Sequence, residues 1–151
     1  MDFDLTDSQR AFRGDVDRFA RERVAPKAAA IDEQGAFPAD LVKEAAKLGL
    51  MGVTIGKEWG GAGRDYVSYA LGIEALSRAS AVLAVIAAVN NSLVAEPIAQ
   101  FGSDSQKDTW LRRLATGESL GAFALSEEQP ASRWRGRHFA AFWQSGPTVW
   151  P

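Results

Sequence analysis

Apolar residues recur at helical spacing through most of the first 115 residues. In the first such stretch, arginine and aspartate residues lie between four apolar side chains that share one face: Phe12, Val16, Phe19 and Val24. This period predicts an amphipathic helix that either Thr6 or Asp7 can cap. Pro26 falls within this helix or near its end.

A second helix is expected after Pro38, since proline suits an early helical position, and it should end at Gly49. Its apolar stripe comprises Leu41, Val42, Ala45 and Leu48. A third helix is expected from about Tyr66, with three side chains facing one way: Tyr69, Ile73 and Leu76. Arg78 follows Glu74 by four residues, which favours a solvated ion pair over a catalytic base.

The chain from Ala81 is apolar on nearly all sides, which predicts a central fourth helix capped by Ser80. A fifth helix is expected after Ser103 and Asp104, before Gly117. The fold class is therefore all-α, with about five helices. The longest apolar run, residues 81–89, is shorter than the roughly 20 residues of a spanning helix, so no membrane span is expected.

Two polar or glycine-rich sites interrupt this pattern. The stretch "GKEWGGAGRD", residues 56–65, lacks Gly-Lys-Ser/Thr and follows no clear strand, so a structural loop is favoured over a phosphate cradle. Asn90-Asn91-Ser92 is read as a helix irregularity, because asparagine tolerates left-handed backbone geometry. The alternative is a place where a ligand enters the helical core.

The composition changes near the C-terminus. "SLGAFALS", residues 119–126, is typical of a short strand or extended segment. Residues 130–151 hold three of the five tryptophans, three arginines, the single histidine and no acid. The remaining 14 basic residues stand against all 19 acidic residues in 1–129, a net charge of −5. We therefore expect one helical domain over residues 1–129 and a poorly ordered, aberrant Arg/Trp-rich tail over 130–151.

The overall composition excludes several classes of function. A net charge of −2 does not favour a nucleic-acid partner, and the acidic N-terminus does not resemble a secretory signal, so the cytoplasm is the expected location. The chain has no cysteine, and His138 is its one histidine. No metal site and no nucleophile–base pair can be assembled from these residues.

Four stretches resemble, in order and spacing, the amino-terminal helical domain of the flavin-dependent acyl-CoA dehydrogenases. They are "DLTDSQRAFRGDVDRFARERVAP", "GLMGVTIGKEWGGAGRDYVSYALGIEALSRASA", "VNNSLVAEPIAQFGSDSQKDTWLRRLATGE" and "GAFALSEE". The resemblance spans residues 1–129. The run Asn90-Asn91-Ser92-Leu93 is most similar to the short-chain and branched-chain members.

The resemblance implies an oxidoreductase that removes two hydrogens from an acyl-CoA thioester, as in fatty-acid or branched-chain amino-acid catabolism. In the family, a glutamate takes the α proton, FAD accepts the β hydrogen as hydride, and an electron-transferring flavoprotein receives the electrons. The flavin lies between domains and across a subunit interface, which implies a homo-oligomer. By resemblance, the FAD contacts are Phe123, Leu125 and Ser126. The implied acyl-pocket residues are Leu93, Ala95 and Glu96.

The chain departs from the family after residue 127. Glu128 stands in place of a proline, and Ala131-Ser132-Arg133 stands where Gly-Ser-Asp is usual. The β domain, the C-terminal domain and the catalytic glutamate have no counterpart, so the catalytic residue is unknown. We expect a truncated fragment that is inactive alone and self-associates through exposed apolar surface.

The tail is expected to be read in a shifted frame, because tryptophan has the single codon TGG, which becomes a glycine codon when read one base late. Two alternatives of other classes stay open. One is a non-catalytic helical module that binds an acyl-CoA or a partner helix. The other is one half of a split dehydrogenase, completed by a separately encoded chain.

Overall fold

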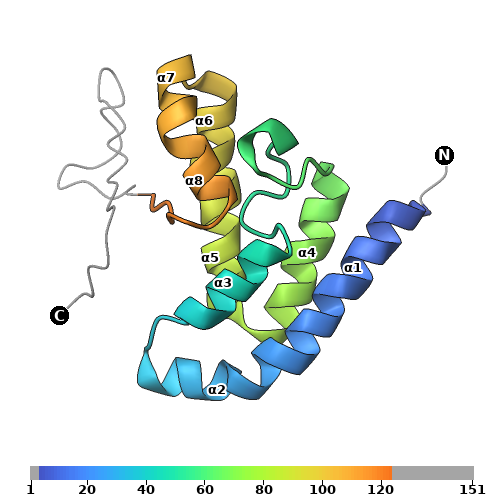
Figure 1. Ribbon diagram of the computed structural model, residues 1–151. Coiled ribbons are helices and arrows are strands. Elements are labelled where there is room, and N and C mark those ends of the chain that lie inside the picture. Colours follow the sequence, from blue (N-terminus) through green and yellow to red (C-terminus); the bar gives the residue numbers. More distant parts are fainter. Residues whose placement is uncertain (1–3, 124–151) are drawn as a thin grey trace, which may run out of the picture.

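The computed structural model describes residues 4–123, which form five helical runs (Figure 1). The first run joins α1 (Asp7–Phe19), the π-helical turn η1 (Ala20–Val24) and α2 (Ala25–Gln34). The second run is α3 (Ala39–Lys47) and the third is α4 (Tyr66–Ala79). A 3-10 turn, η2 (Lys57–Trp59), lies in the glycine-rich loop between them.

The fourth run joins α5 (Ala81–Ala88), the π-helical segment η3 (Val89–Ala95) and α6 (Glu96–Phe101). The fifth comprises α7 (Asp104–Gln106), η4 (Lys107–Leu111) and α8 (Arg112–Ala115). Between residues 4 and 123 no strand is present, which confirms the all-α class. Residues 120–123 have no regular secondary structure, and the rest of the expected strand-like segment, the boundary at 129 and the tail lie outside the described residues.

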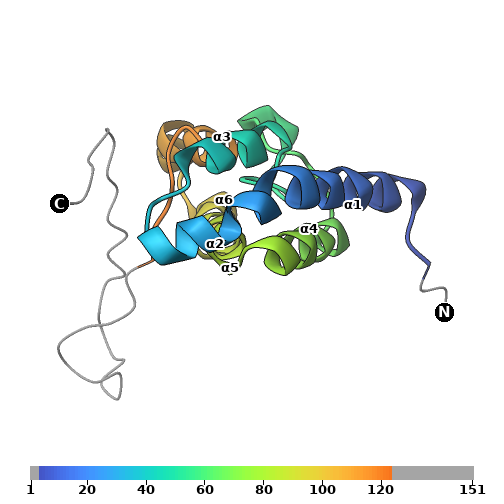
Figure 2. The same ribbon diagram turned by 90° about the horizontal axis from the view of Figure 1, so that it is seen from below.

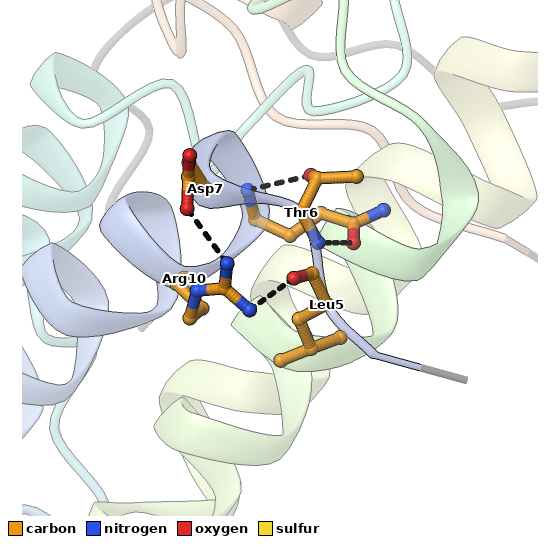
Figure 3. Close-up of polar contacts among 5 residues, drawn as sticks. Leu5, Thr6, Asp7 and Arg10 are labelled. Carbon is orange, nitrogen blue, oxygen red and sulfur yellow. Dashed lines mark hydrogen bonds and ion pairs between the residues drawn. The ribbon is translucent and has the colours of Figure 1, made fainter. Parts of the chain in front are cut away.

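Polar side chains start the helices where the sequence predicts. Thr6, not Asp7, caps α1: its hydroxyl accepts from the backbone of Gln9, whose side chain accepts from the Thr6 N–H in return (Figure 3). Arg10 pairs with Asp7 at 2.6 Å and donates to the Leu5 carbonyl in the same view. Such reciprocal capping satisfies amide groups that the first helical turn leaves free.

Three other helix starts have side-chain caps. The cap residues of α4, α5 and α7 are Asp65, Ser80 and Ser103. Hydrogen bonds from Ser68 and Gln9 hold the pKa of the Asp65 carboxyl below its ordinary value. Arg78 pairs with Glu74 on the exposed side of α4, as the spacing predicts. The caps therefore fix the ends of the helices that build the core.

The two prolines near helix ends compare differently with expectation. Pro26 lies within the first run, as expected, in the first turn of α2 directly after the π-helical turn η1, and the run continues to Gln34. Pro38 is the residue before α3 rather than its first residue. The stripe prediction for α3 was wrong at Leu48, which follows the helix end and is partly exposed.

The helices pack in two adjoining clusters. α1 lies along α4, and α4 lies along α5, as both views show (Figures 1 and 2). The larger cluster lies among these helices and α3, and its bulkiest members are Phe12, Phe19, Leu41, Leu50, Met51, Leu76 and Leu83. The smaller cluster joins the α6 side of the fourth run to the fifth run and comprises Ile55, Val94, Ala95, Leu111, Leu114 and Ala115. The fourth run contributes to both clusters.

The fourth run is less enclosed than its composition predicts. One side packs into both clusters, while Val85 is 60% exposed and Leu93 is 43% exposed. Residues Ala81–Phe101 form a 21-residue helix that is long and apolar enough to cross a membrane by length and composition alone, with a mean hydropathy of 1.6. The core helix of a soluble domain passes the same test, and the buried side of this one carries Asn90 and Asn91.

Candidate functional site

The Asn90-Asn91 pair lies at the centre of the fourth run. Both side chains are 1% exposed, and each carboxamide makes three hydrogen bonds. Asn91 donates to the Leu50 and Ala87 carbonyls and accepts from the Val53 N–H at 2.7 Å. The pair thus satisfies backbone groups of a loop that has no helical partners of its own.

Asn90 connects more distant parts of the chain. Its Nδ2 donates to the Met51 and Leu114 carbonyls, and its Oδ1 accepts from the Gly121 N–H at 2.9 Å. The predicted irregularity is confirmed, since these asparagines lie in the π-helical segment η3. The expected left-handed geometry was wrong, because no non-glycine residue between 4 and 123 has a positive φ angle. The alternative, a polar entry point for a ligand, was wrong for these two side chains because the protein backbone already occupies their donors and acceptors.

Glu96 lies one turn beyond, half-buried at the start of α6. Its carboxylate accepts hydrogen bonds from the Thr54 hydroxyl at 2.8 Å, the Gln100 amide at 3.0 Å and the Tyr66 hydroxyl. Burial raises the pKa of the Glu96 carboxyl, but these donors together outweigh it and leave the pKa below its ordinary value. The hydrogen bond to the Glu96 carboxylate also raises the pKa of the Tyr66 hydroxyl. A carboxylate held this way is a poor proton acceptor.

The structure places the other expected pocket residues on the same helix. Leu93 is exposed one turn before Glu96, whereas Ala95 is fully buried in the smaller cluster. Phe123, from the segment after the fifth run, is 38% exposed. Leu125 and Ser126 lie outside the described residues. Leu93, Glu96 and the segment leading to Phe123 therefore meet at one helix.

The residues that sequence reasoning missed lie on the exposed side of the fourth run. Val85 and Leu93 are exposed, and Val82, Ile86 and Val89 on the same side are partly exposed, although Ile86 and Val89 also pack against the clusters. No charged residue occurs between Arg78 and Glu96. We call the side formed by Val82, Val85, Ile86, Val89 and Leu93 the apolar face. The sequence signal for this face is an apolar stretch without a polar side, which predicts a helix that is buried on all sides.

The remaining candidate features do not form a second site. A groove of about 310 Å³ opens between the first run and α3, where Arg18, Arg23, Glu44 and Lys47 line it. Arg23 and Glu44 are paired there at 2.9 Å, so their charges are matched. Over residues 4–123 no group of histidine, aspartate and glutamate side chains could hold a metal ion.

The glycine-rich loop is structural, as favoured from the sequence. The N–H groups of Gly60, Gly61 and Gly63 donate to carbonyls of the same loop, at 2.9, 3.2 and 2.8 Å. Gly60 and Gly63 have positive φ angles of 80° and 59°, which other residues rarely adopt. These amides are occupied and cannot form a phosphate cradle.

The chain matches the acyl-CoA dehydrogenase N-terminal domain family over residues 6–118. An acyl-CoA dehydrogenase of Bacillus subtilis (strain 168) is 42% identical over 128 residues, which are 85% of this chain and 34% of the relative. The short-chain-specific acyl-CoA dehydrogenase of Clostridium acetobutylicum is 42% identical over 127 residues, 84% of this chain and 34% of the relative.

Solved structures agree with this match. Butyryl-CoA dehydrogenase from Megasphaera elsdenii superposes with a TM-score of 0.79 at 37% identity, covering 85% of this chain and 34% of that one. An acyl-CoA dehydrogenase from Bacillus anthracis in complex with FAD superposes with a TM-score of 0.77 at 36% identity, covering 83% of this chain and 21% of that one. A chain in the structure of the electron transferring flavoprotein of Acidaminococcus fermentans superposes with a TM-score of 0.81 at 33% sequence identity. The match covers 87% of this chain and 34% of that one.

The chain spans about a third of the length of the curated relatives that it matches. Its fold superposes on the corresponding part of these structures, and several similar structures contain FAD or FADH2. The chain belongs to the acyl-CoA dehydrogenase family, and residues 6–118 are its N-terminal domain.

Proposed function

We propose that this chain supplies the N-terminal helical part of an FAD-dependent acyl-CoA dehydrogenase that acts on short acyl chains. The observation that carries the proposal is a juxtaposition. Leu93 and Glu96 lie on the helix to which Asn90 fixes the segment that leads to Phe123. Relatives of similar sequence include a short-chain-specific enzyme and a butyryl-CoA dehydrogenase, which supports the choice of acyl length.

In this proposal the apolar face forms one wall of the acyl pocket. Leu93 contributes an exposed apolar side chain, and Ala95 supports the wall from behind, because it is fully buried. Glu96 bounds the wall at its polar end through contacts with Thr54 and Tyr66. An apolar wall excludes water from the thioester and strengthens hydrogen bonds made beside it.

The same region fits one side of a flavin. Phe123 leaves part of its surface exposed two residues after Gly121, which is hydrogen-bonded to the fourth run, and an exposed aromatic side chain suits an uncharged ring system. We assign contacts to the bound FAD to Phe123, Leu125 and Ser126, of which the last two lie outside the described residues. FAD, when bound, would accept the hydride from the β carbon of the acyl chain.

The general base belongs to another part of the enzyme. Glu96 is the carboxylate on the helix of the proposed wall, but three hydrogen-bond donors hold it in its ionised form. A catalytic base of this kind needs a pKa raised toward the working pH, and that of Glu96 is lowered. We therefore propose that the isolated chain does not oxidise acyl-CoA, and that an electron-transferring flavoprotein accepts electrons from the complete cytoplasmic enzyme.

The proposal is tested by transplantation. Residues 6–126 of this chain, which include Phe123, Leu125 and Ser126, replace the corresponding part of the short-chain-specific enzyme of Clostridium acetobutylicum, which is 42% identical over 127 residues. The chimera is expected to retain FAD and to oxidise a short-chain acyl-CoA with a dye as electron acceptor.

A further inference from the structure

Asn90 lies on the helix of the proposed acyl wall and accepts a hydrogen bond from Gly121, two residues before Phe123. We propose that it is a positioning residue that sets the spacing between the acyl wall and the flavin contact Phe123, an inference that rests on the function proposed above. It touches neither the acyl chain nor the flavin, because its polar atoms are engaged within the protein. Asn90 affects the reaction by fixing the position of Gly121 and therefore of Phe123, two residues later.

The contacts of Asn90 hold it in one orientation. Two carbonyls accept from its Nδ2, that of Met51 at 2.7 Å and that of Leu114 at 3.1 Å. These carbonyls belong to the loop after α3 and to the end of the helical part of the fifth run. The amide group is thereby fixed from two sides, and its Oδ1 presents one acceptor to the Gly121 N–H at 2.9 Å.

Gly121 lies directly on the helix. A Cβ atom added there would lie 2.5 Å from Cγ1 of Val94, so the backbone approaches the helix closely one turn beyond Asn90. Leu93 and Glu96 flank Val94 on the same turn of the fourth run. Two residues of chain span at most about 7 Å, so Phe123 begins within that distance of Gly121.

Spacing of this kind matters for hydride transfer. Reacting atoms must approach to about 3–3.5 Å, and a displacement of about 1 Å costs on the order of a hundredfold in rate. The proposed acyl wall lies on a helix, whereas the proposed flavin contact Phe123 lies on an irregular segment. The spacing between them is kept only if that segment is fixed to the helix. The bond from Gly121 to Asn90 provides that fixation.

Asn91 provides a matched control. It is equally buried and also makes three hydrogen bonds, but they reach Leu50, Val53 and Ala87 and do not reach residues 119–123. A residue that supports overall stability protects all core amides alike. A positioning residue also protects its own segment selectively.

The experiment measures amide hydrogen exchange by NMR in the full chain and its variants. In Asn90→Ala, exchange at Gly121 is expected to accelerate about tenfold more than at core amides such as that of Leu83, as the loss of one hydrogen bond implies. In Asn91→Ala, Gly121 and Leu83 are expected to change together. Equal acceleration at the two amides in Asn90→Ala would overturn the proposal.

A measurement on the wild-type chain covers the case in which Asn90→Ala does not fold. The Gly121 N–H should exchange nearly as slowly as that of Leu83, because a buried carboxamide accepts from it. Exchange at Gly121 as fast as at an exposed amide would contradict the proposal. Neither flavin nor acyl-CoA is present, so failure here is distinct from failure of the transplanted enzyme.

Discussion

Neighbouring donors decide what the Glu96 carboxylate can do. In the sequence it is a glutamate at the end of an apolar run, which is compatible with a base, a pocket residue or a helix cap. The structure gives it hydrogen bonds from three residues of two helices and a loop, namely Thr54, Tyr66 and Gln100. It therefore ties the start of α4 and the loop before η2 to α6. Its negative charge is a structural feature of the proposed wall.

The stability of the domain should depend on the ionisation of Glu96. Its folded-state pKa lies below the ordinary value of 4.5, so the stabilisation is complete above pH 4.5 and is lost as the pH falls through the folded-state pKa. Glu96→Gln keeps the length of the side chain but removes the charge. It is expected to lower the free energy of unfolding by about 1–2 kcal/mol at pH 7 and to flatten the acid dependence.

Urea unfolding of both proteins between pH 7 and pH 3 measures this difference. Glu44→Gln is the control, because Glu44 also has a lowered pKa but forms an exposed pair with Arg23. It should change stability much less, as surface pairs do. If the unfolding free energy of Glu96→Gln fell with decreasing pH in parallel with that of the wild type, the three hydrogen bonds would not stabilise the charged form.

The glycine-rich loop behaves as an element in its own right. Its amides bond back to Gly52, Val53 and Ile55 through the N–H groups of Ala62, Arg64 and Gly63, each at 2.8 Å. The loop is thereby closed without a sheet. It presents Thr54 to Glu96 and Val53 to Asn91, so its glycines serve the packing of the fourth run.

Two glycines with opposite surroundings test this account of the loop. A Cβ at Gly61 would overlap the Ile55 carbonyl, a backbone group that cannot yield locally, so Gly61→Ala should lower the unfolding free energy by roughly 2–3 kcal/mol. Gly14, inside α1, has open space around it. Gly14→Ala should raise stability by about 0.5–1 kcal/mol. Thermal unfolding checks both, and a neutral Gly61→Ala would refute the close approach.

Helices enclose the apolar residues of the molecule on some sides and leave them exposed on another. Its two clusters are enclosed by helices, yet the apolar face of the fourth run remains exposed at Val85 and Leu93. The chain spans about a third of its relatives, and we propose that the remaining part of a complete enzyme closes the acyl pocket over this face. An exposed apolar surface of this kind promotes association.

The isolated chain is therefore expected to self-associate as its concentration rises. Val85→Lys places a charge on the apolar face and should shift the weight-average mass toward the monomer. Phe37→Lys, at a comparably exposed aromatic residue in the loop before α3, should not. Light scattering over a range of concentrations measures the mass. A monomeric wild-type chain at all concentrations would argue against the apolar face as an association surface.

The sequence predicted the helical runs because each carries its own local signal. Thr6, Ser80 and Ser103 are caps at the positions expected, and the stripe of α1 is buried. Side-chain partners across long separations had no such signal. The hydrogen bonds from Gly121 to Asn90 and from Thr54 to Glu96 join residues 31 and 42 positions apart, and only the folded chain brings them together. The apolar face was missed for the same reason, since composition does not reveal what covers a helix.

The most direct test of the proposed function is the turnover of the chimera, measured as dye-linked oxidation of butyryl-CoA per bound flavin. The parent Clostridium enzyme is the positive control, and the 151-residue chain supplied with FAD is the negative control. The proposal predicts bound flavin and oxidation by the chimera and none by the chain alone. A folded chimera without flavin or oxidation, or an isolated chain that oxidises butyryl-CoA, would contradict it.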